Sequence, residues 1–249
     1  MIAFFEKPLL LTRPMNESID FSQLFKGLGT KLPKQNQFIF SPLFSIELIQ
    51  KDINTTNIQA LIFTSSNGVK GFFPNKTPYG IKVFCVGKKT KKTAMDHGFL
   101  NIFVPTIENA NNLSLLINKE CQTSSGSLIY PRGEYVSSNI SEKLRFSGFS
   151  VIEHLVYRQP HNRLKPNVKK NLEDGKIAGV VLFSARTANL FIDCVKELPT
   201  GFIFYCISSE VSKVVISHFG LKKFTYRVSV KANSESVKNM IVNDYNEST

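Results

Sequence analysis

Four short turns rich in serine, threonine, glycine and lysine are the segments of this chain best suited to chemistry. Each turn follows an apolar run of strand length and precedes a segment of helical character. Backbone N–H groups at a helix start lack partners within the helix, and the helix dipole favours negative charge there. The composition of these turns therefore predicts binding of anionic groups. The turns are Thr64–Gly68, Gly87–Thr90, Ser184–Thr187 and Ser208–Glu210.

Helix capping is the alternative interpretation of these turns. Serine and threonine side chains accept hydrogen bonds from the first N–H groups of a helix, whether or not a ligand binds there. For any one turn, capping alone is the simpler explanation. Four such turns favour an anion-binding cleft, because ligands of open α/β sheets sit at the carboxyl ends of the strands.

Other chemistries find little support. The chain contains no motif of zinc proteases, α/β-hydrolases, P-loop nucleotide hydrolases or Rossmann dinucleotide-binding domains. His97 and His218 stand near expected helix ends, where we expect capping, and His154 and His161 lack metal-ligand spacing. No pair of carboxylates stands out for acid–base catalysis. We expect no cofactor and no metal, and a reaction that depends mainly on a shaped, charged cleft.

The charge of the chain favours anionic partners. It carries 31 Lys and Arg against 19 Asp and Glu, a net charge of +12. This excess attracts nucleic acids, anionic membranes or substrates with several carboxylates or phosphates. The densest basic cluster lacks interleaved aromatic residues, so it predicts a solvated helix face or substrate steering and not nucleic-acid binding. The cluster comprises Lys82, Lys88, Lys89, Lys91 and Lys92.

The cysteines indicate the compartment. Cys85, Cys121, Cys194 and Cys206 show no CxxC spacing, and two of them lie inside apolar runs typical of buried thiols. No disulfide is expected, which favours a reducing environment. The first residues lack the pattern of a secretory signal, and no apolar stretch approaches the ~20 residues of a membrane span. We expect a cytoplasmic protein without a membrane partner.

Apolar runs that alternate with helical segments position these turns. Most runs are apolar throughout, as in parallel strands covered on both faces, and predict an α/β fold with mostly parallel sheets. The runs are Leu9–Thr12, Phe38–Phe40, Ala60–Thr64, Lys82–Val86, Ile102–Val104, Ser127–Tyr130, Val151–Tyr157, Gly179–Phe183, Phe202–Ile207 and Phe224–Val228.

An internal repeat organises the chain. Ala60–Phe72 aligns with Gly179–Phe191, and Phe84–Gly87 aligns with Tyr205–Ser208 at nearly the same offset. Each copy follows the order strand, polar turn, helix, strand, polar turn, helix. Two copies predict two similar lobes with a cleft between them.

Several motifs together resemble the uroporphyrinogen-III synthase family. Each motif is weak by itself, but they follow the family's order from about Leu9 to Gly220. The motifs are Leu9–Pro14, Phe63–Val69, Val86–Thr90 with Gly98 and Phe99, Tyr130–Gly133 and Gly148–Arg158.

The resemblance implies two α/β lobes joined by a pair of extended strands. The outgoing link falls near Pro42–Ile46 and the return near Val156–Pro160. Residues 1–42 with 160–249 then form one discontinuous lobe, and residues 43–159 form the inserted lobe.

The family's activity is a cofactor-free lyase reaction of tetrapyrrole (haem) synthesis. Hydroxymethylbilane loses water, and its ring closes with inversion of ring D to give uroporphyrinogen III. The eight carboxylates of this substrate account for the positive charge of the chain. Because uncatalysed closure gives the wrong isomer readily, the enzyme chiefly holds one folded conformer. We expect a monomer whose partner is this small polycarboxylate.

The resemblance also implies site residues. Tyr157 matches a tyrosine at the family's cleft that assists departure of the hydroxyl, although packing between lobes is an equal alternative. Arg13 and Arg132 match positions that pair with carboxylates. The residues expected to bind substrate are Thr12, Arg13, Thr64, Ser65, Ser66, Gly87, Lys88, Thr90, Arg132, Gly133, Ser184, Ala185, Ser208 and Ser209.

The second copy of the repeat departs from the family pattern. Ser184 and Ala185 replace a Thr-Ser pair, and Val211 stands where a threonine is usual, without a hydroxyl to donate. These departures support the alternative that the chain is a two-lobed anion-binding protein with weakened or lost catalysis. Nucleic-acid binding is suggested by charge alone and would show a steep salt dependence.

Overall fold

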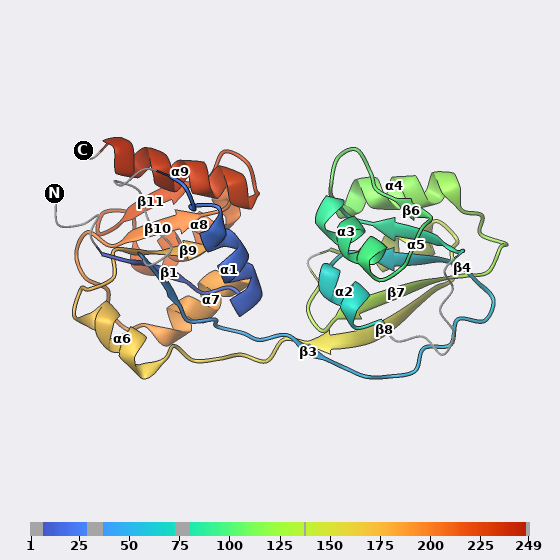
Figure 1. Ribbon diagram of the computed structural model, residues 1–249, viewed down its shortest axis with the longest axis horizontal. Helices are drawn as coiled ribbons and strands as arrows, with labels where there is room; N and C mark the ends of the chain where they lie inside the picture. The colour runs from blue at the N-terminus through green and yellow to red at the C-terminus, as the bar shows by residue number, and fades with distance from the viewer. Residues whose placement is uncertain (1–6, 29–36, 73–79, 137, 248–249) are drawn as a thin grey trace. The chain divides into compact units, whose positions relative to one another are not determined.

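A computed structural model describes residues 7–28, 37–72, 80–136 and 138–247. The chain forms two compact units: unit 1 comprises residues 1–45 and 161–249, and unit 2 comprises residues 46–160 (Figure 1). The first boundary follows Ser45 and not Pro42, because Leu43 is fully buried in the core of unit 1 and Phe44 bridges to His161. Within the described ranges, no helix is long and apolar enough to cross a membrane.

Unit 1 is built around a parallel sheet with the strand order β11-β10-β9-β1-β2 in its described part. Helices α1 and α9 pack on one face, and α6, α7 and α8 pack on the other. The strands are β1 (Leu9–Leu11), β2 (Phe38–Phe40), β9 (Gly179–Leu182), β10 (Ile203–Cys206) and β11 (Thr225–Val228), and the helices are α1 (Met15–Gln23), α6 (Pro166–Glu173), α7 (Ala185–Cys194), α8 (Ser209–Phe219) and α9 (Ser234–Glu247).

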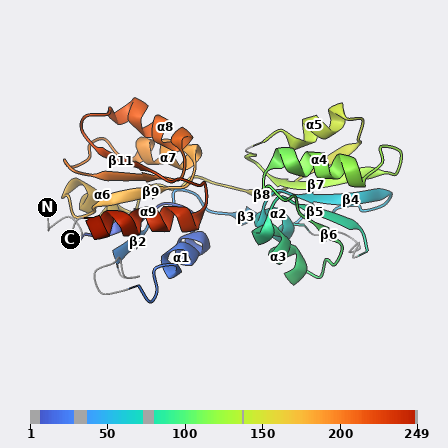
Figure 2. The same cartoon turned by 90° about the horizontal axis from the view of Figure 1, so that it is seen from above.

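Unit 2 has the strand order β3-β8-β7-β4-β5-β6 over its described residues, with β3 antiparallel to β8 and the other pairs parallel. Figure 2 shows α4 and α5 on one face of this sheet and α2 and α3 on the other. The strands are β3 (Glu47–Leu48), β4 (Ile58–Phe63), β5 (Lys82–Cys85), β6 (Ile102–Phe103), β7 (Ser127–Gly133) and β8 (Val151–Arg158), and the helices are α2 (Ser66–Lys70), α3 (Lys88–Asp96), α4 (Ala110–Glu120) and α5 (Ile140–Phe146).

The α/β architecture with mostly parallel strands is confirmed. Every apolar run of the sequence contains a strand, because a parallel strand covered on both faces must be apolar on both. The repeat appears as β4-α2-β5-α3 in unit 2 and β9-α7-β10-α8 in unit 1. Strand β3 was missed, since Glu47 and Leu48 are exposed and only pairing with β8 orders them. Strand β7 continues through Gly133, beyond its apolar run.

The expectations for His97 and for the two cysteines in apolar runs can be compared with the structure. His97 ends α3, and its Nδ1 lies 2.9 Å from the carbonyl oxygen of Thr93, which confirms the capping interpretation. Burial raises the pKa of both Cys85 and Cys206 to about 12, so these thiols stay protonated and unreactive at neutral pH.

Candidate functional site

In unit 1, the fold brings the expected site residues to one edge of the sheet. Strand β9 lies between β1 and β10, and the three strands are parallel. Their carboxyl ends therefore stand side by side, and the residues that follow them become neighbours. These residues are Thr12 and Arg13 after β1, Ser184 and Ala185 after β9, and Ser208 and Ser209 after β10.

Unit 2 gathers its expected residues in the same way. Strands β8, β7, β4 and β5 are consecutive and parallel, so their carboxyl ends form a continuous edge. Along this edge lie Tyr157 on β8, Arg132 and Gly133 on β7, Thr64, Ser65 and Ser66 after β4, and Gly87, Lys88 and Thr90 after β5.

Three of the four turns cap helices with a serine. Each serine hydroxyl accepts a hydrogen bond from a backbone N–H in the first helical turn, which confirms the capping interpretation for these three turns. The bonds run from the N–H of Asn67 to Ser65 at 3.1 Å, from that of Thr187 to Ser184 at 3.1 Å, and from that of Val211 to Ser208 at 3.4 Å. Gly87 begins α3 without a side chain to cap it.

Two further hydroxyls of the expected site, those of Thr64 and Ser66, are engaged within unit 2. Thr64 Oγ1 lies 2.8 Å from the hydroxyl of Tyr130, and Ser66 accepts a hydrogen bond from Thr93 at 3.0 Å. Thr90 is only 5% exposed, on the buried side of α3. The bonded side chains stabilise the turns, and the backbone N–H groups at the helix starts are the remaining candidates for binding anions.

The guanidinium of Arg13 interacts with other side chains of unit 1. Its guanidinium carbon lies 4.1 Å from the centre of the Phe183 ring, and Nε donates to Glu17 at 3.0 Å. Its Nη1 donates more weakly to Ser234 at the start of α9. The neighbouring Thr12 is fully buried, and its hydroxyl has no hydrogen-bond partner among the described residues. Thr12 therefore lies in the interior of unit 1, and its contact with substrate stays a prediction.

Arg132 of unit 2 is also paired with an internal carboxylate. Its Nε donates to Glu153, and its Nη1 donates to the carbonyl of Gly133 at 2.9 Å. Arg145 approaches the other oxygen of Glu153 at 2.9 Å. One carboxylate on β8 thus orients two arginines.

The ionisation of Glu153 reflects these contacts. Burial acts to raise its pKa, but hydrogen bonds from Ser141, Arg132 and Arg145 together hold the pKa below its ordinary value. A depressed pKa in the folded state means that the carboxylate stabilises the fold above its unfolded pKa. That contribution is lost as the pH falls through the folded pKa.

We expect Glu153→Gln to lower the free energy of unfolding by about 1–3 kcal/mol at pH 7, the range for hydrogen bonds to a charged group. The deficit should be smaller at pH 3, below the ordinary pKa of a glutamate, because the stabilisation by the wild-type carboxylate is lost as the pH falls through that range. Urea unfolding at both pH values measures this. Glu142→Gln, at an exposed site on α5, is the control. A deficit independent of pH would contradict the assignment.

A third carboxylate stands at the start of α3. A β-carbon on Gly87 would lie 3.0 Å from Cδ of Glu108 and closer still to its Oε2. The carboxylate of Glu108 therefore lies directly over the expected anion-binding turn. Glu17, Glu108 and Glu153 were all missed from the sequence. Of these three, only Glu17 could have been found from the sequence, because it lies four residues after Arg13, a spacing at which opposite charges often pair.

Tyr157 belongs to the core of unit 2. It is 7% exposed, packs with Phe63 and Ile129 in one hydrophobic cluster, and pairs with Leu48 of β3. Packing is thus one role of this side chain, within unit 2.

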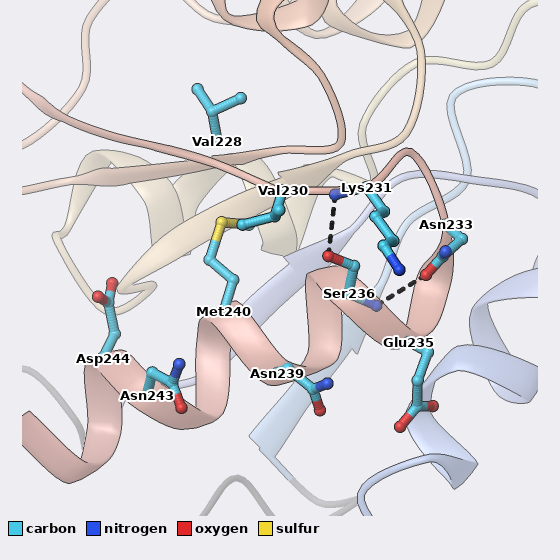
Figure 3. Close-up of a pocket in the computed structure, with 10 residues that line it drawn as sticks. All are labelled: Val228, Val230, Lys231, Asn233, Glu235, Ser236, Asn239, Met240, Asn243 and Asp244. Atoms are coloured by element: carbon cyan, nitrogen blue, oxygen red, sulfur yellow. Dashed lines mark hydrogen bonds between the residues drawn. The ribbon is translucent and has the colours of Figure 1, made fainter.

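A cavity of about 570 Å³ lies in unit 1 beside α9 and the end of β11 (Figure 3). Asn233 is one of the residues that line it, and its side chain caps α9 by accepting a hydrogen bond from the N–H of Ser236 at 2.8 Å. None of the expected site residues lines it. The lining residues are Val228, Val230, Lys231, Asn233, Glu235, Ser236, Asn239, Met240, Asn243 and Asp244.

Comparisons with known proteins agree on one family. Residues 34–234 match the family described as uroporphyrinogen-III synthase HemD. A porphyrin biosynthesis protein HemD of Ruminiclostridium josui is 24% identical over 254 residues, which cover 96% of this chain and 49% of the relative. The chain therefore spans about half the length of that curated relative.

Solved structures share the fold. The uroporphyrinogen-III synthetase of Helicobacter pylori superposes with a TM-score of 0.64 at 14% identity, covering 95% of this chain and 99% of the other. A mutant uroporphyrinogen III synthase of Thermus thermophilus gives 0.57 at 12% identity, covering 97% and 100%. With a family match over most of its length and the same two-unit α/β fold, the chain belongs to the uroporphyrinogen-III synthase family.

Proposed function

We propose that this protein closes hydroxymethylbilane to uroporphyrinogen III, with inversion of ring D and release of water. The observation that carries the proposal is the family match over residues 34–234. The sheets add support, since each collects its expected site residues at one carboxyl edge. The protein acts as a monomer, and its reaction takes place in the cytoplasm.

The carboxylates of the substrate are bound mainly by backbone N–H groups at the helix starts. Lys88 and the neighbouring lysines of α3 raise the local concentration of the anionic substrate. Arg13 and Arg132 already hold Glu17 and Glu153, so a substrate carboxylate shares each guanidinium or displaces its internal partner. Exchange of one carboxylate for another keeps each arginine paired throughout binding.

Tyr157 assists the departure of the substrate hydroxyl by donating a hydrogen bond from its phenol, and the departing oxygen becomes water by taking up the proton that ring D releases when it recloses. The azafulvene cation left behind is attacked by the substituted carbon of ring D, and the spiro intermediate fragments and recloses. The protein's main contribution is to hold the one conformer from which this attack occurs. A tyrosine suits this site because it donates a hydrogen bond without carrying a charge near the cation.

The departures from the family pattern do not dismantle the turns of unit 1. Val211 is 2% exposed within the hydrophobic core, and its N–H still bonds to the Ser208 hydroxyl. Ala185 is the first residue of α7, which Ser184 caps. Both turns therefore keep helix starts that bind through the backbone, so the alternative of an anion-binding protein without catalysis gains no support here.

A coupled assay tests the function. Hydroxymethylbilane is generated in situ, the product is oxidised, and the III and I isomers are separated by chromatography. Excess III isomer over the spontaneous reaction is the expected result. A product mixture identical to that without protein, despite saturable binding of the bilane, would instead establish the anion-binding alternative.

Substitutions in the α3 turn distinguish backbone binding from side-chain binding. We expect Thr90→Ala to weaken substrate binding by at most about 1 kcal/mol, the scale of one neutral hydrogen bond. Gly87→Val should raise KM more, because its side chain fills the space over the turn where Glu108 lies. Steady-state kinetics at two salt concentrations measures both. A crippled Thr90→Ala and a harmless Gly87→Val would contradict the backbone model.

A further inference from the structure

Strands β7 and β8 pair irregularly at their carboxyl ends. Tyr130 stands opposite Glu153 and Arg132 opposite Leu155, but Gly133 stands opposite Tyr157. Val156 is therefore an extra residue on β8, which makes this point a β-bulge. Bulges turn the following side chains and are common beside functional sites.

The bulge decides the face on which Tyr157 lies. Val151 packs with Tyr130 in the core cluster on one face of the sheet. Because side chains alternate along a strand, an unbroken β8 would place Tyr157 on that same face. Instead, Val156 and Tyr157 both pack with Ile129 on the opposite face. The extra residue thus turns the phenol from one face to the other.

The absence of a side chain at Gly133 makes room for the turned ring. A β-carbon there would lie 2.7 Å from the Tyr157 hydroxyl oxygen and closer still to Cε2 and Cζ, whereas real β-carbons essentially never approach heavy atoms within 3.0 Å. The backbone of Gly133 is not left-handed, so any residue could adopt it. Glycine is required by the ring and not by the turn.

A second glycine, Gly71, allows the end of helix α2 to approach the bulge closely. A β-carbon on Gly71, at the end of α2, would lie 2.5 Å from the carbonyl oxygen of Val156. The end of α2 thus lies directly against the extra residue. This contact leaves the bulge little freedom to relax if the ring is displaced.

We propose that Gly133 is the positioning residue of Tyr157: its bare α-carbon and the Val156 bulge seat the phenol ring and so set where its hydroxyl stands. Gly133 was expected to contact substrate. In this proposal it instead contacts Tyr157, because the ring of Tyr157 occupies the space beside the α-carbon of Gly133. The positioning of the ring by Gly133 is argued from the structure alone. The consequence of this positioning for catalysis rests on the proposed function.

A double-mutant cycle on stability tests the seating. Gly133→Ala should lower the urea midpoint of unfolding, whereas the same change in a Tyr157→Leu background should leave the midpoint of that background unchanged. Gly80→Ala, where an added β-carbon meets no atom of the described residues within 4 Å, is the control and should not shift the midpoint. Equal losses in both backgrounds would overturn the proposal. If Gly133→Ala fails to fold, a folded double variant supports the seating and an unfolded one refutes it.

Kinetics tests the catalytic consequence. Gly133→Ala should lower kcat for the III isomer by about 100-fold, the cost of misplacing a group by about 1 Å, with KM unchanged. In the Tyr157→Leu background it should cost nothing more. A raised KM with unchanged kcat would return Gly133 to substrate contact and overturn its positioning role. Absence of all synthase activity, with the stability cycle as expected, would refute the proposed function and not the seating.

Discussion

Tyr157→Phe is expected to lower kcat for uroporphyrinogen III formation by about 100-fold or more, within the range for losing one preorganised hydrogen-bond donor at a developing charge. The substitution removes the hydroxyl and keeps the ring that fills the space over Gly133. KM and the fold should therefore change little. Single-turnover and steady-state assays with isomer analysis measure the loss, and thermal unfolding checks the fold.

Tyr226→Phe is the matched control for this experiment. Tyr226 lies in unit 1, where its hydroxyl donates to the carbonyl of Gly220 at 2.7 Å, and it is not among the expected site residues. Its loss should leave kcat unchanged. Wild-type turnover and isomer ratio in Tyr157→Phe would restrict Tyr157 to packing and remove the phenol from the mechanism.

Gly71→Ala should lower the free energy of unfolding of the protein by about 2–3 kcal/mol, near the upper end for an overpacked core. The added methyl group would meet the carbonyl oxygen of Val156 at 2.5 Å and its Cβ at 3.0 Å. Neither atom can move without shifting the bulge of β8 or the end of α2. Unlike a flexible side chain, this backbone has no low-energy way to make room.

Urea unfolding of Gly71→Ala beside Gly80→Ala isolates the steric effect. Among the described residues, nothing lies within 4 Å of a β-carbon added to Gly80, so alanine there should be neutral or stabilise slightly through the unfolded chain. Equal destabilisation of both variants would show that chain entropy, and not the close approach of α2 to β8, governs these glycines.

Much of the scaffold follows from local pattern. Runs such as Gly179–Leu182 are apolar on both faces and predict parallel strands, and Ser184 or Ser208 before a helical segment predicts a cap. These signals act over a few neighbouring residues. The repeat then predicts two equivalent α/β units, since equal patterns bury equal faces.

The motif glycines show where local pattern stops. Gly68 and Gly133 lie in motifs that hold candidate site residues, Gly71 lies just beyond the motif of Gly68, and Gly133 was expected to bind substrate. In the structure, a β-carbon on Gly68 would lie 2.7 Å from the carbonyl oxygen of Pro131, and those on the other two would strike β8. Each glycine allows segments distant in the chain to approach closely, which no spacing within the motif can show.

By itself, the sequence determined every described strand except β3, the serine-capped turns and the carboxyl edges at which the expected site residues gather. Only the tertiary structure decided how those residues are presented: Arg132 is paired with Glu153, Glu108 lies over Gly87, and the bulge at Val156 turns Tyr157 to the other face of its sheet. The physical reason is that strand register is set by which side chains fit the shared core, and a shift of one residue reverses every face beyond it.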